Sequence, residues 1–485
     1  MLFNSFTFFI FFPIVTIGYF LLPFKLRWMW LFLASCYFYM AFIPVYILIL
    51  FFTIIIDYVA GIMIEKTTTH KKKFLVLSII ANVGVLAFFK YFNFFNENIK
   101  ALSEFIGWNY SISALEIILP IGLSFHTFQA MSYTIEVYRG KQKAEKHLGV
   151  YALYVMYYPQ LVAGPIERPQ NILPQLHLKH DFNSNQAISG FRLMLWGFFK
   201  KMVIADNLST YVNPVYNNPS SFSGLTLLIA TVFFAYQIYC DFSGYSDIAI
   251  GASRVMGINL MKNFDRPYSS KSISEFWKRW HISLSSWFKD YLYIPLGGNR
   301  VPISRVYLNL FIVFMVSGLW HGANWTFVVW GALHGVYLIF GMLYKKAASN
   351  SYLRKVDNFD ALQVLITFCL VTFAWIFFRA NNINDALFAG KNIITNTLSD
   401  LVSVFRDSAL RAKTIYLNGD RWSFMLMIEL ILVLEILQHT FFVKKNLREY
   451  IMNNAFIRWT GYVSLFICIL FLGKFGSDSF IYFQF

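Results

Sequence analysis

Charged side chains are scarce in this sequence, because only 14% of its 485 residues are Asp, Glu, Lys or Arg. Soluble domains carry roughly 25%, so most of the surface of this protein cannot face water. Hydrophobic residues make up 57% of the chain. They gather in runs such as 8–22, 46–56, 74–89 and 227–234, which with their flanks approach or reach the roughly 17–25 residues that cross a bilayer. We therefore predict an all-α, polytopic membrane protein with about 11 transmembrane helices.

Cysteines are also few, and their spacing argues against a disulfide framework. The four of them lie far apart, and none belongs to a CxxC pair: Cys36, Cys240, Cys369 and Cys468. No group of histidines, cysteines and carboxylates has the spacing of metal ligands either. We expect no metal site and no bound cofactor.

We do not expect the N-terminal residues to be a cleavable signal. Residues 1–22 lack a basic n-region and a small-residue cleavage site, so we interpret them as the first spanning helix. No Gly/Ser or Pro linker and no internal repeat interrupts the chain. This favours a single membrane domain over residues 1–485.

The net charge of +16 could suggest a nucleic-acid partner, but its distribution does not. The basic residues lie in short loops between apolar runs, which is the positive-inside pattern of a protein whose partner is the lipid bilayer. With all basic clusters on the cytoplasmic side, the number of crossings predicts that both termini are extracytoplasmic. The clusters are Lys25/Arg27, Lys66/Lys71/Lys72/Lys73, Arg139/Lys141/Lys143/Lys146, Lys345/Lys346/Arg354/Lys355 and Lys444/Lys445/Arg448.

Three polar stretches interrupt the apolar rhythm. Residues 164–185 contain several prolines and cannot span a membrane, and residues 380–421 are rich in Asn and Asp and are predicted to form an extracytoplasmic loop. In the third stretch, Ser272 and Glu275 fit a capping box, which predicts one helix from there to a point before Pro295. We expect this helix to be amphipathic and either interfacial or re-entrant. Its predicted aromatic face holds Trp277, Trp280, His281, Leu284, Trp287, Phe288 and Tyr291, with His281 at the edge.

The segment Ser317-Gly-Leu-Trp-His-Gly-Ala-Asn-Trp325 places His321 between long apolar runs. An imidazole at membrane depth is costly to keep and is by default a functional-site hypothesis. Neutral imidazole can accept a proton from a hydroxyl and return it to a leaving thiolate. The flanking glycines let backbones approach closely and leave room beside the ring. A buried histidine that hydrogen-bonds a neighbouring helix is the alternative, and the presence of His281 favours the functional interpretation.

His281 by itself fits two interpretations equally well, a catalytic group or a headgroup-facing residue. In favour of the first, Trp280 and its aromatic neighbours could orient an acyl carrier, while Lys278 and Arg279 attract its phosphates. His334 is expected to serve helix packing. Between Asp241 and Asp247 we expect no catalytic dyad. Instead, one of the two should pair with a basic residue such as Arg254 or Arg266.

At these residues the chain resembles the membrane-bound O-acyltransferase family, and within it the alginate and peptidoglycan O-acetyltransferase membrane subunits of bacteria. The segments that resemble it are Tyr158-Pro-Gln-Leu-Val-Ala-Gly-Pro-Ile-Glu-Arg168, Cys240-Asp-Phe-Ser-Gly-Tyr-Ser-Asp247, Asn263-Phe-Asp-Arg-Pro-Tyr268, Phe276-Trp-Lys-Arg-Trp-His-Ile-Ser-Leu-Ser285, Ser317-Gly-Leu-Trp-His-Gly322 and Phe480-Ile-Tyr-Phe-Gln-Phe485. The resemblance implies a ring of helices around a central tunnel, with His321 as the family's invariant histidine and His281 as its second.

The resemblance also implies a function. A donor substrate, acetyl-CoA or an acyl carrier protein, would deliver acetyl from the cytoplasm for O-acetylation of a cell-surface or exported polysaccharide, and we expect acetyl-CoA. The acetyl would pass directly or through an extracytoplasmic serine-hydrolase-like (SGNH) subunit, at the bacterial inner membrane. Trp320, Asn324 or a backbone N–H are candidate donors to the developing oxyanion. The rival hypotheses are a transporter or flippase for an acyl or glycolipid substrate and a subunit that only anchors a periplasmic enzyme.

Overall fold

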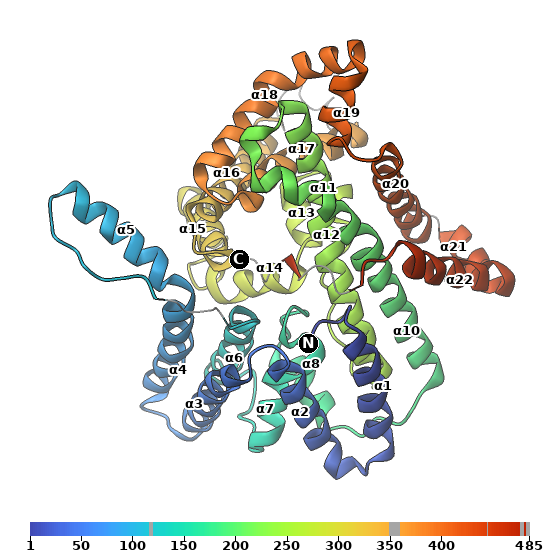
Figure 1. Cartoon of the computed structure of the whole chain (residues 1–485). Coiled ribbons are helices and arrows are strands. Elements are labelled where there is room, and N and C mark those ends of the chain that lie inside the picture. The colour runs from blue at the N-terminus through green and yellow to red at the C-terminus, as the bar shows by residue number, and fades with distance from the viewer. Residues whose placement is uncertain (116–119, 349–358, 444, 476–479, 482–485) are drawn as a thin grey trace. The chain divides into compact units, whose positions relative to one another are not determined.

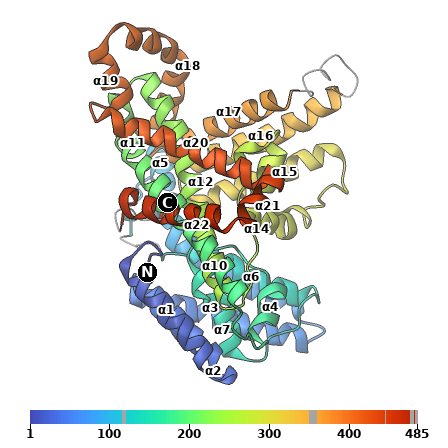
Figure 2. The same cartoon turned by 90° about the vertical axis from the view of Figure 1, so that its right-hand side faces the viewer.

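The computed structural model describes residues 1–115, 120–348, 359–443, 445–475 and 480–481. Over these residues the chain folds into helices and contains no β-strand, which confirms the all-α prediction (Figures 1 and 2). The chain divides into two compact units, one of residues 1–194 and 245–262, the other of residues 195–244 and 263–481. Arg354, Lys355, Lys444 and the last four residues of the chain lie outside the described part.

The helices of the first unit are α1 (Phe6–Leu21), α2 (Phe24–Met40), α3 (Ile47–Lys66), α4 (Lys71–Leu86), α5 (Phe92–Phe105), α6 (Leu123–Tyr138), α7 (Leu148–Met156), α8 (Tyr158–Leu161) and α9 (Pro169–Leu176). Two helices continue from one unit into the other, α10 (Ser184–Phe198) and α12 (Gly224–Val255). In the first unit, α3 packs against both α4 and α6. Buried polar side chains join these helices: Asn82 donates to Asp57 at 2.8 Å, and His126 lies 2.6 Å from Thr53.

The helices of the second unit are α11 (Asp206–Asn217), α13 (Ile273–Arg279), α14 (Ile282–Phe288), α15 (Ile303–His321), α16 (Trp325–Ala348), α17 (Asp360–Arg379), α18 (Ile383–Arg406), α19 (Ser408–Tyr416), α20 (Arg421–Val443), α21 (Lys445–Asn453) and α22 (Ala455–Leu472). Helices α15 and α16 pack against each other along much of their length. A Cβ atom on Gly318 of α15 would collide with the carbonyl oxygen of Phe327 in α16, and one on Gly331 would collide with that of Phe314. Glycine thus permits the close backbone approach expected around His321.

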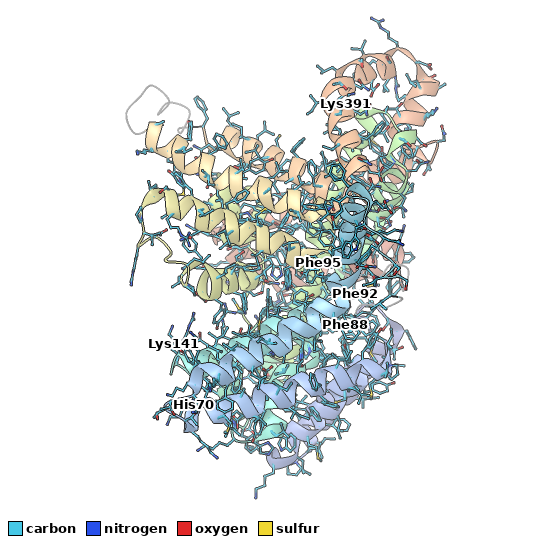
Figure 3. The ribbon with its side chains drawn as sticks, turned by 90° about the vertical axis from the view of Figure 1, so that its left-hand side faces the viewer. His70, Phe88, Phe92, Phe95, Lys141 and Lys391 are labelled. Atoms are coloured by element: carbon cyan, nitrogen blue, oxygen red, sulfur yellow. The ribbon has the colours of Figure 1, made fainter. Side chains whose placement is uncertain are left out.

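Eight helical segments of the described part are long and apolar enough to cross a membrane, which confirms a multi-pass membrane protein. They are Pro44–Lys66, Lys71–Phe105, Gly224–Val255, Ile303–His321, Trp325–Ala347, Asp360–Arg379, Arg421–Thr440 and Ala455–Leu472, and the shorter α1 is apolar too. From the segment that joins α4 to α5 into the first turn of α5, Phe88, Phe92 and Phe95 follow one another at helical spacing (Figure 3). The side chains of Phe88 and Phe95 are 48% and 57% exposed, as expected where lipid is the solvent. The number of about 11 crossings and the central tunnel stay predictions.

The prediction that residues 380–421 form a loop is wrong, because most of them form α18 and α19. Its Asn and Asp residues include the residues that start these helices. Asn382 accepts a hydrogen bond from the backbone N–H of Asp385 at 2.9 Å, and Asp407 accepts one from Ala409 at 2.8 Å. Asn and Asp at a helix N-cap satisfy backbone donors that have no partner within the helix. Some of the Asn and Asp residues in this stretch are therefore helix N-caps and do not indicate a loop.

Candidate active site

His321 is the last residue of α15, and its side chain is nearly buried, with 3% exposed. The helix ends there because Gly322 takes an extended conformation, with φ −160° and ψ 148°. Three aromatic rings surround the imidazole, with centroids at 4.9 Å (Trp320), 5.0 Å (Trp330) and 5.2 Å (Phe378). The turn between α15 and α16 thus holds the histidine in an aromatic, weakly polar environment.

The single helix predicted from Ser272 to a point before Pro295 is wrong. Its start is right, since the N–H of Glu275 donates to the Ser272 hydroxyl at 3.2 Å, but α13 ends at Arg279. His281 has φ 42° and ψ 56°, in the left-handed region, and α14 starts after it. A non-glycine residue seldom adopts this conformation. His281 therefore lies at a break between two short helices.

Tertiary hydrogen bonds hold this break open. The N–H of Ile282 donates to the carbonyl of Asn263 at 2.8 Å, and the N–H of Asp265 donates to the carbonyl of Arg279 at 2.8 Å. A continuous helix would need those backbone groups for its own i to i+4 bonds. The segment around residues 263–265 thus replaces the helical bonds.

The break turns His281 inward, so that none of its surface is exposed. Its Nδ1 lies 3.1 Å from the side-chain oxygen of Asn263, which also accepts from the Ser283 hydroxyl at 2.9 Å. Because an amide oxygen only accepts hydrogen bonds, Nδ1 must bear the proton and Nε2 is the basic nitrogen. Burial lowers the pKa of His281 to about 3. The residue is thus neutral at physiological pH, in the form that accepts a proton.

In the structure, His321 and His281 both lie next to the indole ring of Trp320. The ring of Trp320 lies 4.9 Å from that of His321 and 6.4 Å from that of His281. Trp280 is buried against other rings, at 5.1 Å from Phe264 and 5.0 Å from Trp375. Trp280 therefore forms part of the aromatic wall of the site.

The three polar residues proposed beside the histidines lie in different settings. Lys278 is exposed, and Arg279 forms an ion pair with Glu275 at 2.6 Å. Asn324 accepts from the N–H of Thr326 at 3.0 Å and donates to the carbonyl of Asn381 at 3.1 Å. Its amide thus caps α16 and anchors the turn that follows His321.

Two further residues of α16 belong to the site although the sequence marked neither as functional. Trp330 and His334 are fully buried and are four residues apart, so they share one helix face. The indole N–H of Trp277 donates to His334 Nδ1 at 3.3 Å, which leaves the proton of neutral His334 on Nε2. Within the described residues, neither Trp330 Nε1 nor His334 Nε2 has a hydrogen-bond partner. The sequence did contain a signal for this pair, because Trp330 and His334 are spaced four residues apart, as residues on one helix face are.

The comparison with known proteins decides the family. A family model described as membrane-bound O-acyltransferase matches residues 147–383, which include both histidines. The "Peptidoglycan O-acetyltransferase" of Helicobacter pylori is 36% identical over 428 residues, which cover 81% of this chain and 80% of that protein. The chain belongs to the membrane-bound O-acyltransferase family. It is a multi-pass membrane enzyme that transfers acyl groups to oxygen.

Other members of the family are similar over much of the chain. The "Probable alginate O-acetylase AlgI" of Pseudomonas aeruginosa is 38% identical over 391 residues, covering 80% of this chain and 73% of that protein. The "Teichoic acid D-alanyltransferase" of Bacillus subtilis is 28% identical over 279 residues, covering 53% and 68%. The acyltransferase thus resembles proteins named for different envelope polymers.

The acyltransferase also contains a buried charge cluster in its second unit. Lys201 forms ion pairs with Asp206 at 2.8 Å and with Asp241 at 2.7 Å, and all three side chains are at most 4% exposed. The prediction that Asp241 or Asp247 pairs with a basic residue is thus confirmed for Asp241, although the partner is neither Arg254 nor Arg266. Among the described residues, no three His, Cys, Asp or Glu side chains are placed to hold a metal ion.

Proposed function

We propose that the protein moves an acetyl group from acetyl-CoA in the cytoplasm to a hydroxyl on the other side of a bacterial cytoplasmic membrane. The acceptor is a cell-surface or exported polysaccharide, reached directly or through an extracytoplasmic serine-hydrolase-like partner. Relatives named for acetylation of peptidoglycan and alginate support the acetyl group and the polysaccharide. The position of His321 in the α15–α16 hairpin is the main structural argument.

The charges at the two ends of this hairpin differ. Arg300 precedes α15 and Arg305 lies in its first turn, and Lys345 and Lys346 lie in the last turn of α16. Basic residues favour the cytoplasmic side, and α15 with its 19 residues is about 28 Å long, close to the thickness of the hydrocarbon core. His321, at the turn between the helices, then lies toward the extracytoplasmic side. This position suits a base that serves an acceptor outside the cell.

In the proposed reaction, His321 removes the proton of the incoming hydroxyl as its oxygen attacks the thioester carbonyl. The carbon–sulfur bond then breaks, and the imidazolium returns the proton to the leaving thiolate. Holding both reactants beside one imidazole lowers the barrier mainly by positioning. Trp330 Nε1–H, buried beside His321, is a candidate donor to the carbonyl oxygen as negative charge develops there. Trp320 remains a second candidate.

His281 is proposed to assist as a second neutral base held in one orientation by Asn263. Lys278, the exposed cation of α13, is proposed to attract the phosphates of the donor. Both termini are proposed to be extracytoplasmic. These roles are secondary to that of His321.

The test uses full-length protein in proteoliposomes with acetyl-CoA labelled in the acetyl group. His321→Ala should reduce release of free CoA and formation of acetyl ester by about 10²–10⁴-fold, with unchanged expression and melting temperature. His439→Ala, a change at an exposed histidine of α20, is the matched control and should behave as wild type.

Wild-type transfer by His321→Ala would refute the role of His321 as the base. Histidine-independent export of an acetylated lipid would identify a flippase, and normal glycan acetylation in cells would identify an anchoring subunit.

A further inference from the structure

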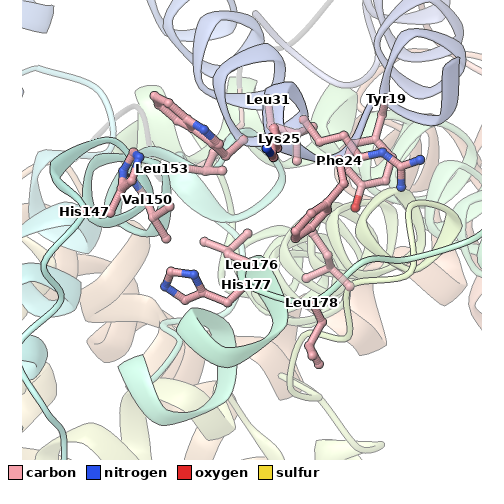
Figure 4. Close-up of a pocket in the computed structure, with 13 residues that line it drawn as sticks. Tyr19, Phe24, Lys25, Leu31, His147, Val150, Leu153, Leu176, His177 and Leu178 are labelled. Carbon is pink, nitrogen blue, oxygen red and sulfur yellow. The ribbon is translucent and has the colours of Figure 1, made fainter. Parts of the chain in front are cut away.

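The first unit contains a cavity of about 330 Å³ near the turn between α1 and α2 (Figure 4). Residues of α1, α2, α7 and α9 line it, and they are not part of the histidine site. Part of its lining is apolar, and we call Leu31, Leu153 and Leu176 together its apolar floor. Its remaining lining includes the cations Lys25 and Arg27. The cavity therefore combines hydrocarbon and positive charge.

Arg27 is the residue that indicates a ligand. Its side chain is nearly buried, with 7% of the residue exposed. The guanidinium donates to the carbonyl oxygens of Leu22 at 3.1 Å, His180 at 2.5 Å and Phe20 at 3.4 Å. Its central carbon also lies 5.0 Å from the ring centroid of Tyr19, whose side chain interacts with it. None of these partners carries a formal negative charge.

No carboxylate of the described residues lies within ion-pair distance of Arg27. Asp181, an acid whose pKa Lys179 lowers and the charge of Arg27 helps to lower, is exposed and is paired with Lys179 at 2.9 Å. A buried charge is normally paired, because leaving it uncompensated in a weakly polar environment costs several kcal/mol. An anion bound in the cavity would compensate this charge.

Lys25 adds a second positive charge at an exposed position of the same cavity. The histidines in the lining are occupied within the protein. His147 accepts from the N–H of Val150 at 3.2 Å, and His177 lies 2.7 Å from Glu145. The two cations therefore form the anion-binding part of the cavity.

The apolar floor and the membrane setting select the class of ligand. On α1, which leads into the cavity, Ile14, Ile17 and Leu21 are 56%, 59% and 80% exposed, as expected for a lipid-facing side. The loop with Lys25 and Arg27 is cytoplasmic by the positive-inside rule, and anionic lipids attract basic residues on that side. We propose that this cavity, the Arg27 pocket, binds the phosphate of an anionic phospholipid and rests the start of its acyl chain on the apolar floor.

Binding is measured by native mass spectrometry of the full-length protein with phosphatidylglycerol and, separately, phosphatidylcholine. We expect at least tenfold tighter retention of phosphatidylglycerol, and a tenfold or greater loss of that retention in Arg27→Gln. Because Arg27 also binds three carbonyls, two variants that leave it in place are needed. Lys25→Gln removes the exposed charge, and Leu178→Trp adds bulk at an exposed residue of the lining. Both should weaken retention, whereas Lys66→Gln, an exposed basic residue outside the lining, should not.

The other sources of phosphate are separated by competition. Inorganic phosphate and coenzyme A should not displace the lipid. Displacement by coenzyme A at micromolar concentration would overturn the proposal in favour of a donor site. Equal retention of the two lipids, or unchanged retention in both Lys25→Gln and Leu178→Trp, would also overturn it. Because no acyl transfer is measured, the outcome is independent of the proposed function.

Discussion

Asn263 and His281 form a hydrogen bond of 3.1 Å between the amide oxygen and Nδ1. It joins residues 18 positions apart, and it fixes which nitrogen of the buried imidazole bears the proton. The same amide oxygen accepts from the Ser283 hydroxyl, so the start of α14 and the histidine share one acceptor. His281 is therefore held as a neutral ring of defined tautomer.

The first prediction concerns acid stability. Burial lowers the pKa of His281 from 6.5 to about 3 in the folded protein. Below pH 6.5 the unfolded chain binds the proton more readily, so the free energy of unfolding falls as the pH decreases, by about 1.4 kcal/mol per pH unit. His281→Asn removes this titration and suits the left-handed conformation. The melting temperature of the variant should fall less than that of wild type between pH 7 and pH 5.

In the same variant, acetyl transfer at pH 7 should decrease, but less than in His321→Ala. Identical melting curves for wild type and His281→Asn at both pH values would show that His281 is hydrated or already charged in the folded protein. The other histidines titrate equally in both proteins, so they cancel in the comparison.

Local sequence patterns predicted the parts of the fold that depend on local physics. Apolar runs predicted the spanning helices, and Ser272 predicted the start of α13, because both signals act within a few residues. The break at His281 depends on backbone bonds from Asn263 and Asp265. A helical pattern of aromatic residues has no information about such distant partners, and this is why one helix was expected where two exist.

The second prediction concerns the indole N–H of Trp330. Trp330→Phe keeps an aromatic ring between His321 and His334 but removes a buried donor that has no partner in the described part of the chain. If this donor stabilises the oxyanion, the turnover rate should fall about 10²–10³-fold, with little change in the KM for acetyl-CoA. The melting temperature should stay the same or rise, because an unsatisfied buried N–H is destabilising. Unchanged turnover would exclude Trp330 as the donor.

The candidate site could be predicted only in part. His321 and His281 stand out because histidines are rare beside long apolar runs, and the structure places both against Trp320. Trp330 and Asn263 were not assigned roles, since a tryptophan or an asparagine in a membrane helix or loop is not unusual in itself. Their importance depends on which residues they contact.

The third prediction concerns the buried cluster of Lys201, Asp206 and Asp241. Lys201→Met leaves two carboxylates uncompensated in the interior, and removing one partner of a buried pair typically costs about 3–5 kcal/mol. The melting temperature and the yield of folded protein should fall clearly. Lys271→Met is the control, because its ion pair with Asp360 is 46% and 69% exposed, and such a pair contributes about 1 kcal/mol or less. Equal effects of the two substitutions would mean that water reaches the cluster.

The fourth prediction compares two glycines on the α15–α16 hairpin. A Cβ at Gly318 would collide with the carbonyl oxygen of Phe327, which belongs to the backbone and cannot rotate away. Gly318→Ala should therefore separate the helices and lower the melting temperature. It should also reduce acetyl transfer, because His321 is only three residues further along α15. At Gly341 of α16 a Cβ would meet nothing within 4 Å, so Gly341→Ala should raise stability by up to about 1 kcal/mol through helix propensity. The same substitution should thus have opposite signs at the two positions, measured by thermal unfolding in one detergent. If Gly318→Ala is as stable and active as Gly341→Ala, close backbone contact is not what positions His321.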